Sequence, residues 1–214
     1  MVYRELLLGC GHNRQKRIEP YHFAPDLVAP EGGRAWRGQV ETMDCNPNCN
    51  PDMVWDLNVT PWCRLGDEGA YPLADSTYDE IHAYEVLEHL GQQGDFHSFF
   101  ATFAEVWRLL RPGGFLAATC PSRYSEWLWG DPGHRRAILP ASLVFLNQPQ
   151  YAAQLGQTSM SGYAHVYQAD FDTLMTHDNR NTHQFVLRAV KPSRWVPPTS
   201  HGRHPHEAAS ATDS

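Results

Sequence analysis

The chain has 214 residues, of which 42% are hydrophobic and 19% charged, a balance typical of a folded globular domain rather than a disordered chain. A formal net charge of −7 argues against a protein that binds polyanions without sequence preference. No run approaches the roughly 18 apolar residues that span a bilayer, and the first residues do not form the cationic and then apolar pattern of a signal peptide. We therefore expect a soluble, cytoplasmic protein without a membrane segment.

The cysteines indicate neither a disulfide framework nor a zinc site. Five of them form an odd set without the spacing of a disulfide framework, which favours reduced thiols in a cytoplasm. Cys45, Cys49 and Cys63 lack the C-x2-C spacing of a zinc knuckle, and no paired fourth ligand follows them at a suitable distance. The sequence therefore predicts no metal site.

Short apolar runs separated by turn residues predict the strands of a sheet. Residues 5–9 (ELLLG) are apolar and end in glycine, which is typical of a buried parallel strand. Residues 13–38 show little helical periodicity and contain three prolines, so we interpret them as mostly loop. A second loop, rich in glycine, proline and aspartate, should follow the third strand. Further strands are predicted over 39–43 (ending at Asp44), 52–57, 78–83 and 115–119.

Two helices are predicted in the centre of the chain. One should begin near Glu85, directly after the fourth strand. The other should run from 96 to 110, where Phe99, Phe103 and Val106 recur at three- and four-residue steps and give one apolar face. The run Arg111-Pro-Gly-Gly should end this helix, because proline cannot continue it and glycine supplies the turn.

The last third of the chain departs from the alternation of strands and helices. Residues 122–168 are rich in Trp, Tyr, His and Pro and look like an insertion. Residues 171–177 and 183–190 flank a good turn at 178–181, which predicts a hairpin. The sequence predicts one α/β domain over 1–196, with a mostly parallel sheet and a C-terminal antiparallel hairpin, and a disordered tail over 197–214.

Glycines and carboxylates follow three of the predicted strands. In Gly9-Cys10-Gly11, two glycines let the backbone turn tightly and approach a ligand, although a simple tight turn has the same pattern. Asp44 ends the second strand, where a carboxylate can accept both hydroxyls of a ribose, and Asp56 ends the third. The position of the third glycine of a dinucleotide fingerprint is occupied by Arg14, which argues against NAD.

A family resemblance appears at 72–90, PLADSTYDEIHAYEVLEHL. This stretch resembles the signature of the class I methyltransferases of the type 11 family, in which a similar run leads into the fourth strand and a Val-Leu-Glu-His segment. Residues 111–119, RPGGFLAAT, are similar to the family's next landmark, and the likeness extends over about 5–122. Two departures stand out: Leu7 occupies the place of an acidic residue, and the first crossover helix is reduced.

The resemblance implies a Rossmann-like sheet that binds S-adenosyl-L-methionine and promotes in-line attack on its sulfonium methyl. The protein then mainly aligns and desolvates the reactants. Glycines of the first turn would cradle the methionine portion, the two aspartates would bind ribose and adenine, and the exit of the fourth strand would lie near the sulfonium. The implied cofactor-binding residues are Gly9, Cys10, Gly11, Asp44, Asp56, Leu57, Ala83 and Tyr84.

The acceptor side is predicted from the 122–168 segment, because functional groups concentrate on irregular loops. We expect Tyr124, Trp127, Trp129, Asp131 and Arg135 to contact the acceptor, although tryptophans that pack the core would give the same composition. A general base is needed only for an N–H or O–H acceptor, and His134, His89 and Glu85 are the candidates.

The sequence does not name the acceptor. Sugars, lipid precursors, small metabolites, modified nucleobases and proteins stay open, and the negative charge favours a small molecule or saccharide. Two alternatives remain: a methyltransferase-like protein that binds cofactor or serves an assembly without turnover, and a nucleotide-dependent enzyme on a similar sheet. The oligomeric state is not indicated.

Overall fold

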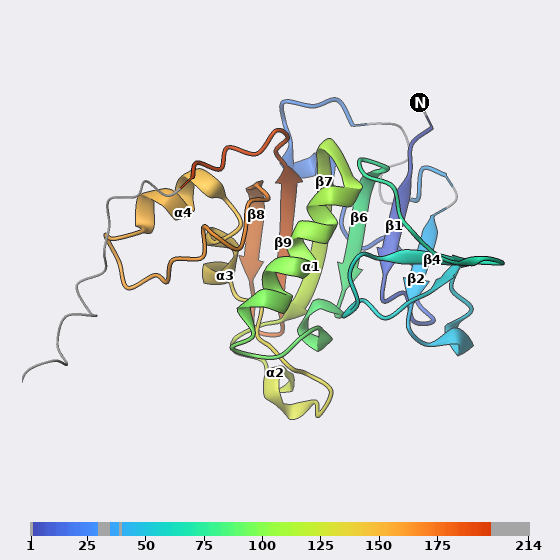
Figure 1. Ribbon diagram of the computed structural model, residues 1–214. Helices are drawn as coiled ribbons and strands as arrows, with labels where there is room; N and C mark the ends of the chain where they lie inside the picture. Colours follow the sequence, from blue (N-terminus) through green and yellow to red (C-terminus); the bar gives the residue numbers. More distant parts are fainter. Residues whose placement is uncertain (1, 30–34, 39, 198–214) are drawn as a thin grey trace, which may run out of the picture.

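The computed structural model describes residues 2–29, 35–38 and 40–197, and its main element is a seven-stranded sheet (Figure 1). The strands lie in the order β3 (Met53–Val54), β2 (Glu41–Asp44), β1 (Glu5–Leu8), β6 (Tyr78–Tyr84), β7 (Leu110–Pro121), β9 (Thr182–Ala189) and β8 (Phe171–Asp178). Strands β3, β2, β1, β6 and β7 are neighbours in this order and pair in parallel. Strand β9 pairs antiparallel with β7, and β8 pairs antiparallel with β9. The expected mostly parallel α/β sheet with a C-terminal hairpin is therefore confirmed.

One face of the sheet is apolar and is covered by α1 (Phe96–Leu109), which crosses in front of the strands in Figure 1. The helix begins at its N-cap Asp95, whose side chain accepts a hydrogen bond from the Ser98 backbone at 3.1 Å. Its predicted apolar stripe packs on alternate residues of the strands, because successive side chains of a strand point to opposite faces. The helix ends directly at β7, so that strand begins five residues before the predicted 115–119.

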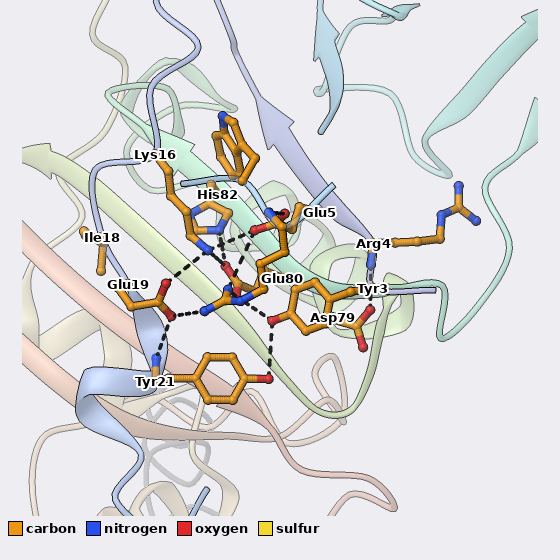
Figure 2. A network of polar contacts seen from close by, with 12 residues as sticks. Tyr3, Arg4, Glu5, Lys16, Ile18, Glu19, Tyr21, Asp79, Glu80 and His82 are labelled. Atoms are coloured by element: carbon orange, nitrogen blue, oxygen red, sulfur yellow. Dashed lines mark hydrogen bonds and ion pairs between the residues drawn. The ribbon is translucent and has the colours of Figure 1, made fainter. Parts of the chain in front are cut away.

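The opposite face of the sheet is covered by the connection between β1 and β2. In the described part of this connection, the one helical element is the 3-10 turn η1 (Pro20–Phe23), so the reduction of the first crossover helix is confirmed. Leu7, Ile18, Tyr84 and Phe115 belong to a smaller apolar cluster on this face. Beside that cluster lies a buried network of charged and polar side chains, shown in Figure 2.

Lys16 is the centre of this buried network. Its ammonium lies 2.9 Å from Glu5, 3.4 Å from Glu19 and 2.6 Å from Glu80, and all four side chains are at most 1% exposed. A second cation, Arg37, pairs with Glu19 at 2.8 Å and also with Glu80. Ion pairing offsets the large cost of burying the carboxylates. The network therefore joins the crossover connection to β1 and β6.

A chain of hydrogen bonds extends the network toward the carboxyl end of β6. The Tyr84 hydroxyl accepts backbone N–H groups of Arg17 (3.1 Å) and Ile18 (3.2 Å). Its own proton is then donated to His82 Nδ1 at 2.6 Å, and His82 Nε2–H donates to Glu80 at 2.7 Å. Burial lowers the pKa of His82, which is consistent with this neutral form. Burial alone would raise the pKa of Glu80, but the hydrogen bond from His82 and the charge of Lys16 hold it at about 2.

The segment after β6 differs from the prediction. The helix expected to begin near Glu85 is wrong, because Glu85 has φ +57° and only the 3-10 turn η3 (Leu87–His89) follows. The Glu88 carbonyl accepts N–H groups of Arg135 (2.8 Å) and Arg136 (3.1 Å), so these distant residues take the bonds that would continue a helix. The chain then leaves η3 at a left-handed glycine, Gly91.

Further elements occur in the two predicted loop regions. The loop after β3 contains an antiparallel hairpin, β4 (Cys63–Gly66) and β5 (Gly69–Pro72), and β3 itself is shorter than the predicted 52–57. Residues 122–168 are all described and contain no strand. They hold three short helices, α2 (Trp127–Gly130), α3 (Pro140–Val144) and α4 (Gln148–Gln154).

Two further expectations concern the C-terminal tail and membrane-spanning helices. The predicted disordered tail lies outside the described residues, apart from Pro197. Across the described ranges, no helix combines the length and the apolar character needed to cross a membrane.

Candidate functional site

A cavity of about 500 Å³ opens at the carboxyl ends of the parallel strands. This edge is where open α/β sheets commonly bind ligands. Its walls come from the turns after β1, β2, β3 and β6 and from the loop that follows α2. The lining residues are Gly9, Asp44, Cys45, Trp55, Asp56, Leu57, Asn58, Glu85, Val86, His89, Leu90, Gly133 and Arg135.

The turn after β1 requires glycine at its first position. Gly9 has φ +55°, and a Cβ there would lie 2.4 Å from the Val86 side chain. Its N–H donates to the Met43 carbonyl at 2.8 Å, which holds the turn against the end of β2. The backbone of β1 therefore reaches the cavity without a side chain in the way.

Asp44 is fixed at the end of β2 by two backbone groups. One carboxylate oxygen accepts the Gly11 N–H at 2.9 Å and the other accepts the Asn46 N–H at 2.9 Å. A carboxylate oxygen has two lone pairs, so each can accept another hydrogen bond from a ligand in the cavity. The arrangement suits a ligand with two adjacent hydroxyl groups.

The end of β3 is tied to η3 through Asn58. Asp56 accepts the backbone N–H of Asn58 at 2.9 Å and its side-chain amide at 2.8 Å. The side-chain oxygen Oδ1 of Asn58 in turn accepts the Gly91 N–H at 2.7 Å. This pair therefore holds two walls of the cavity together, and Asp56 remains exposed toward solvent.

The fourth wall is formed by η3 and the 131–136 loop. His89 Nδ1 lies 3.0 Å from the Gly133 carbonyl, and the Arg135 carbonyl accepts the Gln93 N–H at 2.7 Å. The ring of His134 lies edge-on to that of His89, with centroids 4.7 Å apart. Residues 42 or more positions apart in the sequence are thus held beside one another.

The structure places a majority of the predicted cofactor and catalytic positions at this cavity or directly behind it. The hydroxyl of Tyr84 points to the crossover connection instead, and Cys10 and Ala83 are buried in the two apolar clusters. Gly11 contributes through its bond to Asp44, and the His134 side chain is only 8% exposed. The predicted residues that line the cavity are Gly9, Asp44, Asp56, Leu57, Glu85, His89 and Arg135.

The predicted acceptor residues on α2 and beside it do not line this cavity. Tyr124, Trp127 and Trp129 are 65%, 63% and 59% exposed, so they do not fill the hydrophobic core. Asp131 accepts the Gly133 N–H at 2.7 Å and so shapes the loop that carries His134. Figure 1 shows α2 beyond the carboxyl ends of β6 and β7.

Sequence reasoning missed several lining residues. Asn58, Trp55 and Val86 bring no chemical signature of their own, although Trp55 and Asn58 flank the predicted Asp56. A second cavity of about 210 Å³ was also not foreseen. It lies between α1 and the 122–168 segment, and its aromatic walls include Phe96, Phe99, Phe100, Phe145 and Tyr163.

Known proteins are similar to this chain over part of its length. Residues 38–118 match the profile of the methyltransferase type 11 family, described as a methyltransferase domain. A probable S-adenosylmethionine-dependent methyltransferase of Mycolicibacterium smegmatis is 33% identical over 87 residues. That match covers 39% of this chain and 32% of the relative, so the chain matches about a third of that relative's length.

Two solved structures are also similar. A SAM-dependent methyltransferase from Archaeoglobus fulgidus has a TM-score of 0.48 at 14% identity, with 87% of this chain and 86% of that chain covered. The N-methyltransferase NodS of Bradyrhizobium japonicum, solved with S-adenosyl-L-homocysteine, has a TM-score of 0.45 at 12% identity, with 87% and 78% covered. The profile match spans β2, β3, the 72–90 signature and β7 as far as Ala118. Residues 38–118 of this chain are therefore similar to a methyltransferase domain of the type 11 family.

Proposed function

We propose that the chain is an S-adenosylmethionine-dependent methyltransferase that binds its cofactor in the 500 Å³ cavity. The observation that carries the proposal is the convergence of Gly9, Asp44 and Asp56 on this one cavity, from the ends of three adjacent parallel strands. The match of residues 38–118 to the profile of the methyltransferase type 11 family supports the same activity.

The ends of the three strands would each bind a different part of the cofactor. The bare backbone at Gly9 leaves room for the methionine portion, and the fixed carboxylate of Asp44 can accept the two ribose hydroxyls. Asp56 and Leu57 would contact the adenine amino group and ring. Cys10, Gly11, Ala83 and Tyr84 would support this binding from behind, since these residues do not line the cavity.

The bound cofactor supplies an activated methyl group on a sulfonium. The protein's task is then to align the acceptor with that methyl and to exclude water, which can contribute ~7–11 kcal/mol. Glu85 and His89 line the cavity, and the ring of His134 lies behind His89. These are the groups available to take a proton when the acceptor attacks through an O–H or N–H.

A small molecule or saccharide-type acceptor is proposed in preference to a nucleic acid or protein. The chain carries a formal net charge of −7, and a polyanionic acceptor would be repelled by it. The exposed Tyr124, Trp127 and Trp129, on α2 and just before it, can stack on a ring such as that of a sugar. Arg135, at the cavity wall, adds a positive group.

Binding of S-adenosyl-L-homocysteine tests the cofactor assignment. Calorimetry of the full chain should show one saturable site, and a tenfold excess of NAD should not compete. Displacement by NAD would instead support the nucleotide-dependent enzyme. Binding of S-adenosylmethionine with no turnover on any acceptor class would support a cofactor-binding or assembly protein.

Two variants test the acceptor side. Trp129→Ala and His134→Ala should leave cofactor affinity within a few-fold, while methyl transfer falls at least ~10-fold, or about 1.4 kcal/mol of transition-state stabilisation. His165→Ala, at an exposed position outside both cavities, is the control and should keep full activity. Full activity in both test variants would place the acceptor elsewhere.

A further inference from the structure

We infer that Glu88, His89 and His134 form a binding site for one divalent first-row transition-metal ion, directly beside the cavity. One ligand atom from each of the three side chains lies within 4.8 Å of the other two. His89 also lines the cavity, so an ion at this site would be reached from it.

The spacing of the three side chains is close to that of a metal site. His134 Nε2 lies 4.0 Å from a Glu88 carboxylate oxygen. Ligands at the usual 2.0–2.2 Å from an ion lie roughly 3–4 Å from one another. Closing the site therefore needs shifts of about 1 Å in the positions of these side chains.

Both histidines are oriented as metal ligands are. His89 Nδ1 lies 3.0 Å from the Gly133 carbonyl, and His134 Nδ1 lies 3.3 Å from the Leu128 carbonyl. Since a carbonyl only accepts, each Nδ1 carries the proton and each Nε2 has a free lone pair. Metal-ligating histidines characteristically donate their other ring N–H to such a carbonyl, which fixes the tautomer and the ring.

Glu88 supplies the independent observation. Its side chain is fully buried, and neither carboxylate oxygen has a hydrogen-bond partner among the residues that the structure describes. A buried polar group without a partner is costly and calls for an explanation such as an ion. A bound cation would supply the positive charge that a buried carboxylate needs.

A second cluster of possible ligands already contains a cation. Glu5, Glu80 and His82 also have ligand atoms within 4.8 Å of one another, but the ammonium of Lys16 lies 2.9 and 2.6 Å from the two carboxylates. The charge that those carboxylates need is therefore already present. No lysine or arginine pairs with Glu88 in the described part of the chain, so its carboxylate still lacks a counter-charge.

The ligand set indicates the kind of ion. Two imidazole nitrogens and one carboxylate suit Zn²⁺, Mn²⁺, Fe²⁺ or Co²⁺, whereas Mg²⁺ and Ca²⁺ prefer oxygen ligands. Three protein ligands leave open positions for an acceptor oxygen, whose pKa the ion would lower. This use in catalysis depends on the proposed methyl transfer, whereas the binding of the ion does not.

Titration with Co²⁺ tests the site, because its visible bands report the ligands. The full chain is used with His201, His204 and His206 replaced by alanine, so that the tail cannot bind the probe. We expect one Co²⁺ per chain by calorimetry, visible bands of a nitrogen- and oxygen-ligated ion, and no intense near-ultraviolet band of a cobalt–thiolate bond. Mg²⁺ should bind at least tenfold more weakly.

Variants assign the ligands. Glu88→Gln and His134→Ala should each weaken Co²⁺ binding at least tenfold, whereas His97→Ala, on the exposed side of α1, should not change it. The amide in Glu88→Gln is uncharged, so this variant should keep or raise the Tm without metal, which shows that it folds. Absence of saturable binding, a thiolate band, or affinity unchanged in both variants would overturn the site.

A parallel titration with S-adenosyl-L-homocysteine separates this inference from the proposed function. Co²⁺ binding without S-adenosyl-L-homocysteine binding would leave the metal site standing and contradict the cofactor assignment. The reverse result would contradict the metal site alone.

Discussion

The two faces of the sheet are built on different principles. On one face, α1 lays an apolar stripe over alternate residues of β1, β6, β7 and β9. On the other, an irregular connection buries Lys16 and Arg37 among three glutamates, beside a smaller apolar cluster. Hydrophobic burial is non-directional and tolerates small shifts, whereas a buried ionic network depends on each partner being present. The two faces should therefore respond differently to substitution and to pH.

The difference also positions the cavity. The polar face fixes the connection that leaves Gly9 and Gly11, through bonds from the Arg17 and Ile18 backbone to Tyr84. The apolar face fixes β6, whose last residues lead into Glu85 and η3. The cavity lies where the two kinds of support meet, so damage to either face is expected to reach it.

Removal of the central cation should have the largest effect. Lys16→Met leaves Glu5, Glu19 and Glu80 buried with too little positive charge, and should lower the free energy of unfolding by about 3–5 kcal/mol. Arg64→Met is the control, because this 48% exposed arginine pairs with Glu41 near the surface and should cost less than about 1 kcal/mol. Equal losses in urea denaturation would contradict a special role for the network.

A cavity on the apolar face should cost somewhat less. Leu109 of α1 is fully buried, and Leu109→Ala should lower the free energy of unfolding by about 2–4 kcal/mol through lost burial and the space left behind. His97→Ala, on the exposed side of the same helix, should change it by less than about 0.5 kcal/mol. A loss below 1 kcal/mol for Leu109→Ala would show that α1 is not the main cover of this face.

Acid should weaken the polar face selectively. Burial lowers the pKa of His82 in the folded chain. Below about pH 6.5 the unfolded chain therefore binds a proton that the folded chain does not, and the free energy of unfolding decreases as the pH is lowered. The ionisable groups that face the imidazole ring of His82 are Glu80, Glu5 and Lys16. The hydroxyl of Tyr84 is hydrogen-bonded to Nδ1 of the same ring.

His82→Gln should remove up to about 1.4 kcal/mol per pH unit from this slope between pH 6.5 and 5, measured by urea denaturation at each pH. Leu109→Ala is the matched control and should keep the slope of the unsubstituted chain. An unchanged slope in His82→Gln would mean that His82 is charged in the fold.

The smallest expected effect is at the start of α1. Asp95→Ala removes the side chain that accepts the Ser98 N–H and should cost about 1 kcal/mol. Asp95→Asn keeps an acceptor at the N-cap and should retain most of the stability. A similar loss in both variants, measured by thermal unfolding, would indicate that charge rather than capping matters at this position.

Sequence patterns predicted the regular parts of this fold because those parts depend on local periodicity. The apolar run at 5–9, the stripe at 96–110 and the hairpin around 178–181 each carry their signal within one short segment, and all three elements are present. The cavity positions Gly9, Asp44 and Asp56 were reached by the same route, since each follows a predicted strand.

The remaining features depend on contacts between distant residues, which one sequence does not reveal. The Glu88 carbonyl is bonded by Arg135 and Arg136, so the predicted helix near Glu85 is replaced by a single turn. Strands β4 and β5 are largely exposed and therefore carry no alternating apolar signal. Lys16 and Arg37 look like ordinary surface charges in the sequence, and only the fold brings them to three glutamates.

The central claim is that S-adenosylmethionine binds where Asp44 closes the second strand, and one titration tests it most directly. S-adenosyl-L-homocysteine should bind the full chain at one site, and Asp44→Ala should weaken that binding by ~1–3 kcal/mol, about 5- to 150-fold. Asp67→Ala, at an exposed turn between β4 and β5, should bind as the unsubstituted chain does. Affinity within twofold of the unsubstituted chain in Asp44→Ala, with the fold intact, would contradict the claim.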